Sequence, residues 1–329
     1  MTNEKRKMQN SFKFLAFILS FALLVLLVPM GQSESMSNGL AFSSKAYAQA
    51  IRSFTIIPPT IEKKLSPGES EAGAVKIVNN SDEAVSFTVS LQDFIVEDTQ
   101  GTPKILPPNT LPRKYSAASW MSIDPNRFVL SPHEKQELNY FISVPKNGRP
   151  GGHYAAIIYN PDVGEATGVG TGVDTKVGTL VYIGVKGLIN ESGAVTKFLA
   201  PTLQEWGPVK ILTQITNNGD LHIRPQGSIS LFDMLGQRVQ VQDLSEKNIF
   251  PGGVARDYQN SFGGKLMIGR YKASLLASYG RSNNLPLTAT AYFWVLPWKL
   301  FLLLVLVIIT AVLTFLYLKR RDKIIPPPA

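Results

Sequence analysis

The 329-residue sequence contains no cysteine and only three histidines. Without cysteine, neither disulfide bonds nor thiolate metal sites can stabilise the fold, so each domain must rely on its own apolar core. Helix-period patterns are missing outside two apolar segments near the ends of the chain, which argues against helical and α/β folds. No set of acids, bases or metal ligands converges in the sequence, and we therefore expect no cofactor and no metal ion.

The sequence also lacks a basic domain, although its formal net charge is +9. Residues 1–50 hold five basic and two acidic side chains, and residues 298–329 hold five and one. The remaining 51–297 segment holds 23 basic and 21 acidic side chains and is close to neutral. A nucleic-acid-binding domain would need its positive charge there, on one face and interleaved with aromatics. We expect no nucleic-acid partner.

The N-terminus has the features of an export signal. Three basic residues within the first seven positions precede an apolar run over 14–28. That run has the length of a signal-peptide core and is short for a membrane span of about 20 residues. Residues 46–50 contain two overlapping A-x-A cleavage patterns. Residues 1–50 are therefore predicted to be a cleaved signal peptide, with an uncleaved N-terminal anchor as the alternative.

A second apolar run covers residues 300–318 and is long enough to cross a bilayer. Tryptophans precede it and basic residues follow at once, and this positive flank predicts a cytoplasmic C-terminus. We predict a transmembrane helix over 297–318, a cytoplasmic basic tail over 319–329, and a single-pass membrane protein whose N-terminal ectodomain lies outside the cytoplasm. The predicted membrane-anchor residues are Trp294, Trp298, Lys319, Arg320 and Arg321.

The segment between the two ends is predicted to form strands. Residues 84–94 alternate with period two, placing Val85, Phe87 and Val89 on one face and hydroxyl side chains on the other. Other short segments rich in β-branched and aromatic residues are separated by turn residues. They cover 74–80, 137–144, 154–159 and 178–187 in the first half and 227–239, 248–258, 269–280 and 287–295 in the second.

The strand pattern repeats along the chain. "VKIVNNSD" at 75–82 is echoed by "VKILTQITNNGD" at 209–220. We predict an all-β fold of two tandem immunoglobulin-like β-sandwiches, over 51–191 and 192–296, plus the C-terminal transmembrane helix.

This layout resembles the WxL-interacting cell-surface proteins of Gram-positive bacteria. The matching stretches are "VKIVNNSDEAVSFTV", "FVLSPHEKQELNYFISVP", "PGGHYAAIIY" and "VGTLVYIGVKG" in the first half, with "ITNNGD", "NIFPGG" and "GRYKASL" in the second. The resemblance implies a peptidoglycan-binding front domain, a second β domain implicated in partner or host binding, and a C-terminal membrane anchor.

Two histidines could suggest chemistry. His133 opens an H-E-x-x-E pattern, one residue away from a zinc-protease motif that needs two ligands one helical turn apart. Pro132 and the alternation over 138–144 predict a strand instead, which separates positions four apart by about 13 Å. His133 is therefore predicted to be a turn residue ahead of that strand. His153 follows a proline and two glycines and is predicted to lie in a connection that leads into a strand. We assign no catalytic residue.

Residues 285–289, "LPLTA", resemble a sortase cell-wall signal ahead of an apolar span and a basic tail. The alternation over 287–293 instead predicts the last strand of the second sandwich. Cutting after Thr288 would remove that strand and expose a sheet edge. Sorting therefore stays an alternative to the membrane anchor.

The sequence thus predicts a non-enzymatic, membrane-anchored binding or scaffold protein with a monomeric ectodomain and with peptidoglycan, other wall polymer or surface proteins as partners. A cell-wall hydrolase and a chaperone-like accessory subunit of a surface assembly are the alternatives. Contacts are expected from the loops at 98–116 and 162–177, the second containing a glycine-rich hairpin stretch. The candidate contact residues are Lys104, Arg113, Lys114 and Tyr115.

Overall fold

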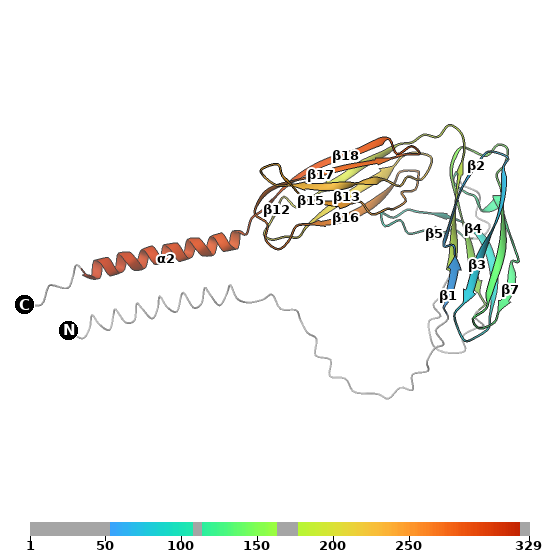
Figure 1. The fold of residues 1–329 in the computed structure, drawn as a ribbon, viewed down its shortest axis with the longest axis horizontal. Helices are drawn as coiled ribbons and strands as arrows, with labels where there is room; N and C mark the ends of the chain where they lie inside the picture. Colours follow the sequence, from blue (N-terminus) through green and yellow to red (C-terminus); the bar gives the residue numbers. More distant parts are fainter. Residues whose placement is uncertain (1–52, 108–113, 163–176, 323–329) are drawn as a thin grey trace, which may run out of the picture. The chain divides into compact units, whose positions relative to one another are not determined.

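The computed structural model describes residues 53–107, 114–162 and 177–322. They form two tandem immunoglobulin-like β-sandwiches followed by one apolar helix, which confirms the predicted fold class (Figure 1). The predicted signal peptide, Arg113 and the glycine-rich stretch at 168–172 lie outside the described residues. The predicted domain boundary at 191/192 falls between the last strand of the first sandwich and the first strand of the second.

The front sandwich pairs a four-stranded sheet, in the order β1-β3-β8-β6, with a six-stranded sheet in the order β2-β10-β9-β4-β5, where β7 also pairs with β4. The first sheet contains β1 (Phe54–Ile57), β3 (Ser70–Asn79), β8 (Lys135–Ser143) and β6 (Met121–Asp124). The second contains β2 (Thr60–Leu65), β10 (Val177–Val185), β9 (Gly151–Pro161), β4 (Val85–Ile95), β5 (Lys104–Ile105) and β7 (Arg127–Leu130).

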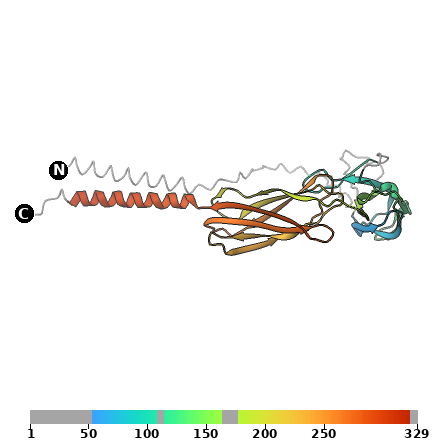
Figure 2. The same cartoon turned by 90° about the horizontal axis from the view of Figure 1, so that it is seen from above.

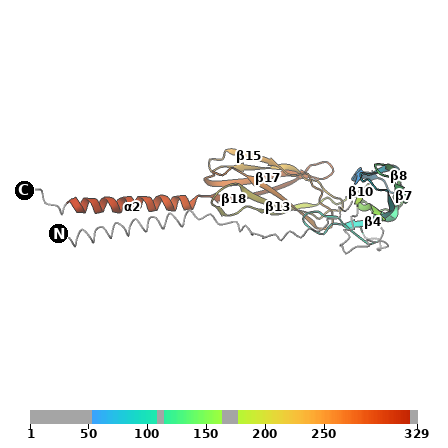
Figure 3. The ribbon, with the colours of Figure 1, turned by 90° about the horizontal axis from the view of Figure 1, so that it is seen from below.

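The rear sandwich pairs a three-stranded sheet, β11-β13-β16, with a five-stranded sheet, β12-β18-β17-β14-β15. Its strands run along its length in two layers (Figures 2 and 3). They are β11 (Gly193–Leu199), β13 (Val209–Asn217), β16 (Val254–Phe262), β12 (Leu203–Gln204), β18 (Leu285–Val295), β17 (Gly269–Tyr279), β14 (Gln226–Phe232) and β15 (Arg238–Asp243).

Each sandwich has its own apolar core, as expected for a chain without disulfides. In β8 the predicted alternation is confirmed, because Leu138, Tyr140 and Ile142 are buried between exposed neighbours. β9 does not alternate, since all its residues from Gly151 to Tyr159 are buried. One row of β9 side chains belongs to the front core and the other to a separate apolar cluster. The outer face of β9 is therefore covered.

The repeated sequence motif forms the same local structure in both sandwiches. Asn79 and Asn217 are both fully buried, and each donates from Nδ2 to the carbonyl four residues ahead, at 2.7 and 2.8 Å. Each also donates to a carbonyl of a more distant segment, Leu130 at 3.3 Å and Ile249 at 2.8 Å. The N–H two residues ahead then donates back to the Asn Oδ1. One side chain thus shapes the same turn in both sandwiches.

The C-terminal helix α2 (Trp298–Asp322) is long and apolar enough to cross a membrane over Trp298–Arg320. The helix continues beyond the predicted span, 297–318, through Lys319, Arg320 and Arg321 of the predicted tail. Lysine and arginine are good helix formers and favour the negative end of the helix dipole. The predicted sortase-like stretch opens β18, which pairs with β17 along its whole length, as the strand alternative predicts.

Candidate binding cleft where the sandwiches meet

An aromatic cluster joins the two sandwiches, and we call it the joint cluster. Phe250 of the rear sandwich is buried against three aromatic side chains of the front sandwich. Its ring centroid lies 4.9 Å from that of Tyr154, 5.6 Å from Phe94 and 5.5 Å from Tyr182, all edge-to-face. This is the favoured geometry for aromatic pairs. The buried members are Phe94, Val96, Tyr154, Ala156, Ile158, Tyr182 and Phe250.

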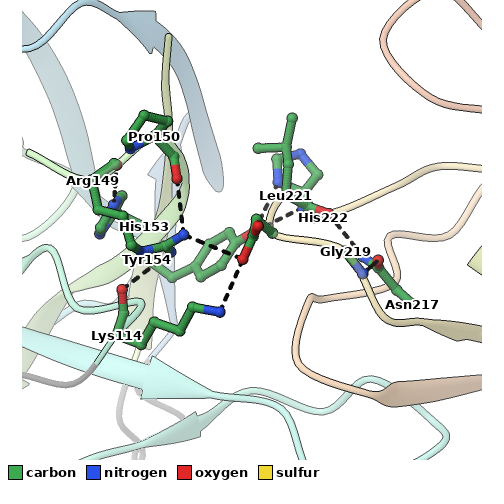
Figure 4. Close-up of polar contacts among 10 residues, drawn as sticks. Lys114, Arg149, Pro150, His153, Tyr154, Asn217, Gly219, Leu221 and His222 are labelled. Atoms are coloured by element: carbon green, nitrogen blue, oxygen red, sulfur yellow. Dashed lines mark hydrogen bonds and ion pairs between the residues drawn. The ribbon is translucent and has the colours of Figure 1, made fainter. Parts of the chain in front are cut away.

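Beside the joint cluster, the hydroxyl group of Tyr154 makes polar contacts with the rear sandwich (Figure 4). The Tyr154 hydroxyl oxygen accepts a hydrogen bond from the His222 backbone N–H at 3.0 Å and lies 3.2 Å from His222 Nδ1. His222 Nε2 lies 3.2 Å from the Glu62 carboxylate, and this hydrogen bond is the main cause that lowers the pKa of Glu62. Burial raises the pKa of Tyr154, so its hydroxyl stays neutral.

A second set of polar contacts gathers at Asp220. Its carboxylate accepts hydrogen bonds from Lys114 Nζ at 2.9 Å and Arg149 Nη1 at 3.3 Å, and the contact with Lys114 is the main cause that lowers the pKa of Asp220. Its carbonyl accepts the Gly152 N–H at 2.7 Å. Asp220 therefore contacts two segments of the front sandwich at once, at Lys114 and at Arg149 to Gly152 (Figure 4).

The repeated turn explains why these residues lie at the joint. Asp220 and His222 follow Asn217 in the "NNGDLH" turn, which Asn217 fixes through its hydrogen bonds. The equivalent aspartate of the front copy, Asp82, has a side chain that is 96% exposed and lies 3.1 Å from His133. Both copies contain the same turn. In the rear copy, two residues of this turn, Asp220 and His222, contact the front sandwich.

A third contact comes from the segment between β4 and β5. The Asp257 N–H on β16 donates to the Thr99 carbonyl at 2.9 Å. A Cβ on Gly101 would fall 1.0 Å from an Arg256 guanidinium nitrogen, so this glycine allows the segment to approach β16 closely.

A cleft of about 210 Å³ opens beside the joint cluster. Tyr115 forms part of its wall, and the charged ends of Lys114 and Arg149 each lie 5.1 Å from the Tyr115 ring centroid. Such placement of cations over an aromatic ring is attractive. The lining is otherwise mostly apolar and consists of Phe94, Ile95, Val96, Glu97, Tyr154, Phe250, Pro251, Gly252 and Val254.

The structure brings two of the predicted contact residues together. Lys114 and Tyr115 lie at the joint and its cleft. Lys104 lies apart from them in β5 and pairs with exposed Glu97 at 2.9 Å. Sequence reasoning missed Tyr154, Asp220, His222 and Phe250. Two features of the sequence could have indicated these residues. They are the unbroken apolar run of β9 and the second copy of the Asn-Asn turn.

The histidine predictions had different outcomes. His133 lies in a turn with φ of 59°, and the similar Ser-Pro turn at 66–69 of the same sandwich has Gly68 at 81°. His153 does not lie in the connection but within β9, buried against Trp120. Its ring nitrogens lie 3.1 and 2.9 Å from the carbonyls of Ser116 and Arg149. Burial outweighs these hydrogen bonds and lowers the pKa of His153.

These positions predict different effects of the two alanine substitutions. His153→Ala should lower the free energy of unfolding by about 1–3 kcal/mol, because it removes a buried ring that hydrogen-bonds to the main chain and packs against Trp120. His133→Ala, the matched control at an exposed turn, should change it by less than about 0.5 kcal/mol. Urea unfolding of both variants measures the difference. Equal losses would show that the buried contacts of His153 contribute nothing.

The acidic groups near the joint already have partners. Among the residues that the structure describes, no group of three or more histidine, aspartate or glutamate side chains could hold a metal ion. The carboxylates near the joint, Glu62 and Asp220, are held in contacts with His222 and with cations. An apolar cleft with a cationic edge can receive a side chain and pair with a charge beside it.

Comparison with known proteins relates the chain to others by fold alone. No family model matches the sequence, and no curated protein is similar to it. Among solved structures, it is similar to the class 5 fimbriae chaperone CfaA, with 13% identity and a TM-score of 0.38 over 72% of this chain and 98% of that chain. It is also similar to the CupB2 chaperone of Pseudomonas aeruginosa, with 8% identity and a TM-score of 0.34 over 73% and 100%. A third is the CsuC–CsuE chaperone–tip complex of Acinetobacter baumannii, with 13% identity and a TM-score of 0.32 over 64% and 90%.

Proposed function

We propose that this chain is a membrane-anchored binding protein of the cell surface, without enzymatic activity, whose partner is another surface protein. The observation that carries the proposal is the cleft beside the joint cluster, with Tyr115 in its wall. At about 210 Å³ it is smaller than the roughly 300–1,000 Å³ typical of small-molecule sites. It suits one anchoring side chain of a protein partner, as in many interface hot spots.

The charge around the cleft supports a specific kind of anchor. Lys114 and Arg149 lie over Tyr115, while Glu97 lines the cleft and pairs with Lys104. An apolar or aromatic side chain of the partner would fill the cleft, and an acidic neighbour would meet Lys114 and Arg149. Because this charge is local and the 51–297 segment is nearly neutral, moderate salt should weaken binding little.

We further propose that the chain is a member of the WxL-interacting type, on the motifs quoted above, with the N-terminal side of α2 outside the cell. Peptidoglycan is the alternative ligand under this proposal. A wall polymer would have to bind along an extended surface, because the cleft has room for only a small group.

A chaperone-like accessory role in surface assembly is the second candidate, and β15 is the observation that favours it. This six-residue strand is at the edge of the five-stranded sheet, and Val239 and Val241 are exposed on it. An extended segment of a partner could pair with such an edge. Among the other edges, β1 and β6 have four residues each, β11 contains a register shift, and β16 already donates from the Asp257 N–H to Thr99.

The full-length protein in lipid nanodiscs distinguishes these functions. We expect it to retain proteins from a detergent extract of the cell surface and not purified peptidoglycan. Tyr115→Ala should weaken the retained interaction about tenfold or more, which corresponds to a loss of at least about 1.4 kcal/mol. Phe141→Ala, an exposed aromatic residue on β8, is the matched control.

Three other outcomes would favour a different function. Loss of binding in Val241→Lys with no effect of Tyr115→Ala would favour strand capture through β15. Retention of peptidoglycan alone would favour the wall-polymer alternative. Release of soluble wall fragments over time would replace binding with hydrolysis.

A further inference from the structure

The end of the rear sandwich that leads into α2 carries exposed apolar loop tips. In the turn between β14 and β15, Leu235 is 78% exposed and Met234 is exposed beside it. In the connection between β16 and β17, Leu266 is 73% exposed and Ile268 is also exposed. Turns between strands are usually rich in Gly, Asn, Asp and Ser. Apolar tips on neighbouring turns indicate an interaction surface.

Strand register places these turns at the same end as the helix. Val295, the last residue of β18, is opposite Gly269, the first residue of β17, and Lys272 is opposite Phe232 at the end of β14. Met234 packs against Gly269, since a Cβ there would lie 2.1 Å from the Met234 Cε. The two turns and the exit to α2 therefore adjoin.

The turn that presents Leu235 is fixed by hydrogen bonds. Asp233 Oδ1 accepts the N–H groups of Leu235 and Gln237, each at 2.9 Å. Backbone hydrogen bonds also join Asp233 to Gly236 and Gln237. Because the backbone is held in this way, Leu235 cannot turn back toward the core without breaking those bonds.

The exit to α2 is short and also hydrogen-bonded. Two residues, Leu296 and Pro297, separate β18 from α2 and can span at most about 7 Å. The Leu296 N–H donates to the Gln204 carbonyl at 2.9 Å, and Lys299 pairs with Glu205 at 2.8 Å. If α2 crosses a membrane, this end of the sandwich lies at the headgroups.

The same end is locally basic, unlike the nearly neutral 51–297 segment as a whole. Exposed Arg238, Lys265 and Arg270 make no ion pair with any acid that the structure describes. Exposed Tyr292, Trp294 and Trp298 accompany them, with the Arg270 guanidinium 4.5 Å from the Tyr292 ring centroid. Aromatic rings, cations and apolar tips together are typical of protein surfaces that lie in a membrane interface.

We propose that this end of the rear sandwich is a membrane-docking collar, formed by Met234, Leu235, Leu266, Ile268 and their basic and aromatic neighbours. The collar inserts its apolar tips into the headgroup region of the leaflet that α2 enters, and its cations contact anionic lipid. The occupant is the bilayer and not a second copy of the chain, because the short exit holds the collar at the surface of the membrane that α2 spans. The inference rests on the proposed membrane anchor.

The chain has no cysteine, so single labelling sites can be introduced cleanly. Leu235→Cys and Leu266→Cys carry an environment-sensitive fluorophore in the full-length protein, reconstituted in vesicles that contain lipid-attached quenchers and phosphatidylglycerol. Leu188→Cys, 99% exposed in the connection between the sandwiches, is the control. We expect several-fold stronger quenching at 235 and 266 than at 188. Replacing phosphatidylglycerol with a zwitterionic lipid should reduce the quenching at 235 and 266.

Equal quenching at 235, 266 and 188 would overturn the collar. Probe shielding that disappears when the protein is diluted in lipid would also overturn it and assign the surface to a second copy. Extraction of the unlabelled protein by alkaline carbonate tests the anchor separately. Resistance to extraction together with equal quenching would leave the anchor intact and refute the collar alone.

Discussion

Replacing Asn217 with alanine should lower the free energy of unfolding of the rear sandwich by about 3 kcal/mol or more, since each unpaired buried polar group costs about 1–3 kcal/mol. The Asn217 side chain is fully buried and pairs with the carbonyls of Leu221 and Ile249 and with the Gly219 N–H. Alanine leaves the Leu221 carbonyl and the Gly219 N–H without this partner, whereas the Ile249 carbonyl keeps its hydrogen bond from the Ile223 N–H. Chemical denaturation followed by tryptophan fluorescence measures the loss.

The sequence itself supplies two controls for this prediction. Asn218→Ala changes an exposed neighbour and should change stability by less than about 0.5 kcal/mol. Asn79→Ala removes the equivalent side chain of the front sandwich. It should lower the free energy of unfolding of the front sandwich by about as much as Asn217→Ala lowers that of the rear sandwich. Only Asn217→Ala should also disturb the joint, because Asp220 and His222 depend on its turn. A wild-type denaturation midpoint in Asn217→Ala would show that water replaces the side chain at little cost.

The period-two pattern and the strand composition were sufficient to predict the pair of sandwiches and many of their strands, but not the short strands such as β1, β2, β6 and β7. Residues 85–89 and 137–143 alternate because one side of each strand packs on a core and the other meets solvent, and this difference is visible in the sequence. The predicted alternation over 84–94 is wrong beyond Val89, because Phe94, on the face predicted to be wet, is buried in the joint cluster. The repeated Asn-Asn turn could be recognised for a similar reason, since one side chain shapes it locally.

The joint could not be predicted in the same way. The run at 154–159 indicated a buried strand, but periodicity does not reveal what covers its second face, which here includes Phe250, far away in sequence. Lys114 and Tyr115 were predicted to be loop residues available to a partner. Lys114 also pairs with Asp220 across the joint, and no local pattern records a contact between such distant positions. His153 was assigned to a connection because the preceding proline and glycines hid the start of β9 at Gly151.

Phe250→Ala should have the largest effect on how firmly the two sandwiches are held together. Phe250 is the buried residue that the rear sandwich contributes to the joint cluster, and it packs edge-to-face on Phe94, Tyr154 and Tyr182. Truncating a buried phenylalanine typically costs about 3–5 kcal/mol. Most of that loss should fall on the joint, because the core of the rear sandwich is a separate cluster. The remaining polar contacts at Asp220 involve partly exposed ion pairs, which contribute about 0–1 kcal/mol each.

We therefore expect both sandwiches of Phe250→Ala to stay folded and to move independently. Spin labels at Asn139→Cys on β8 and Thr288→Cys on β18, both exposed positions, report the distance between the sandwiches by pulsed electron paramagnetic resonance. The distance distribution should be narrow in the wild type and broad in Phe250→Ala. Phe262→Ala is the matched control, because Phe262 is fully buried in the rear core and outside the joint cluster. It should destabilise the rear sandwich by a similar amount and leave the distribution narrow. A narrow distribution in Phe250→Ala would mean that the polar contacts alone hold the sandwiches together, and broadening in Phe262→Ala would mean that the joint depends on the stability of the rear core.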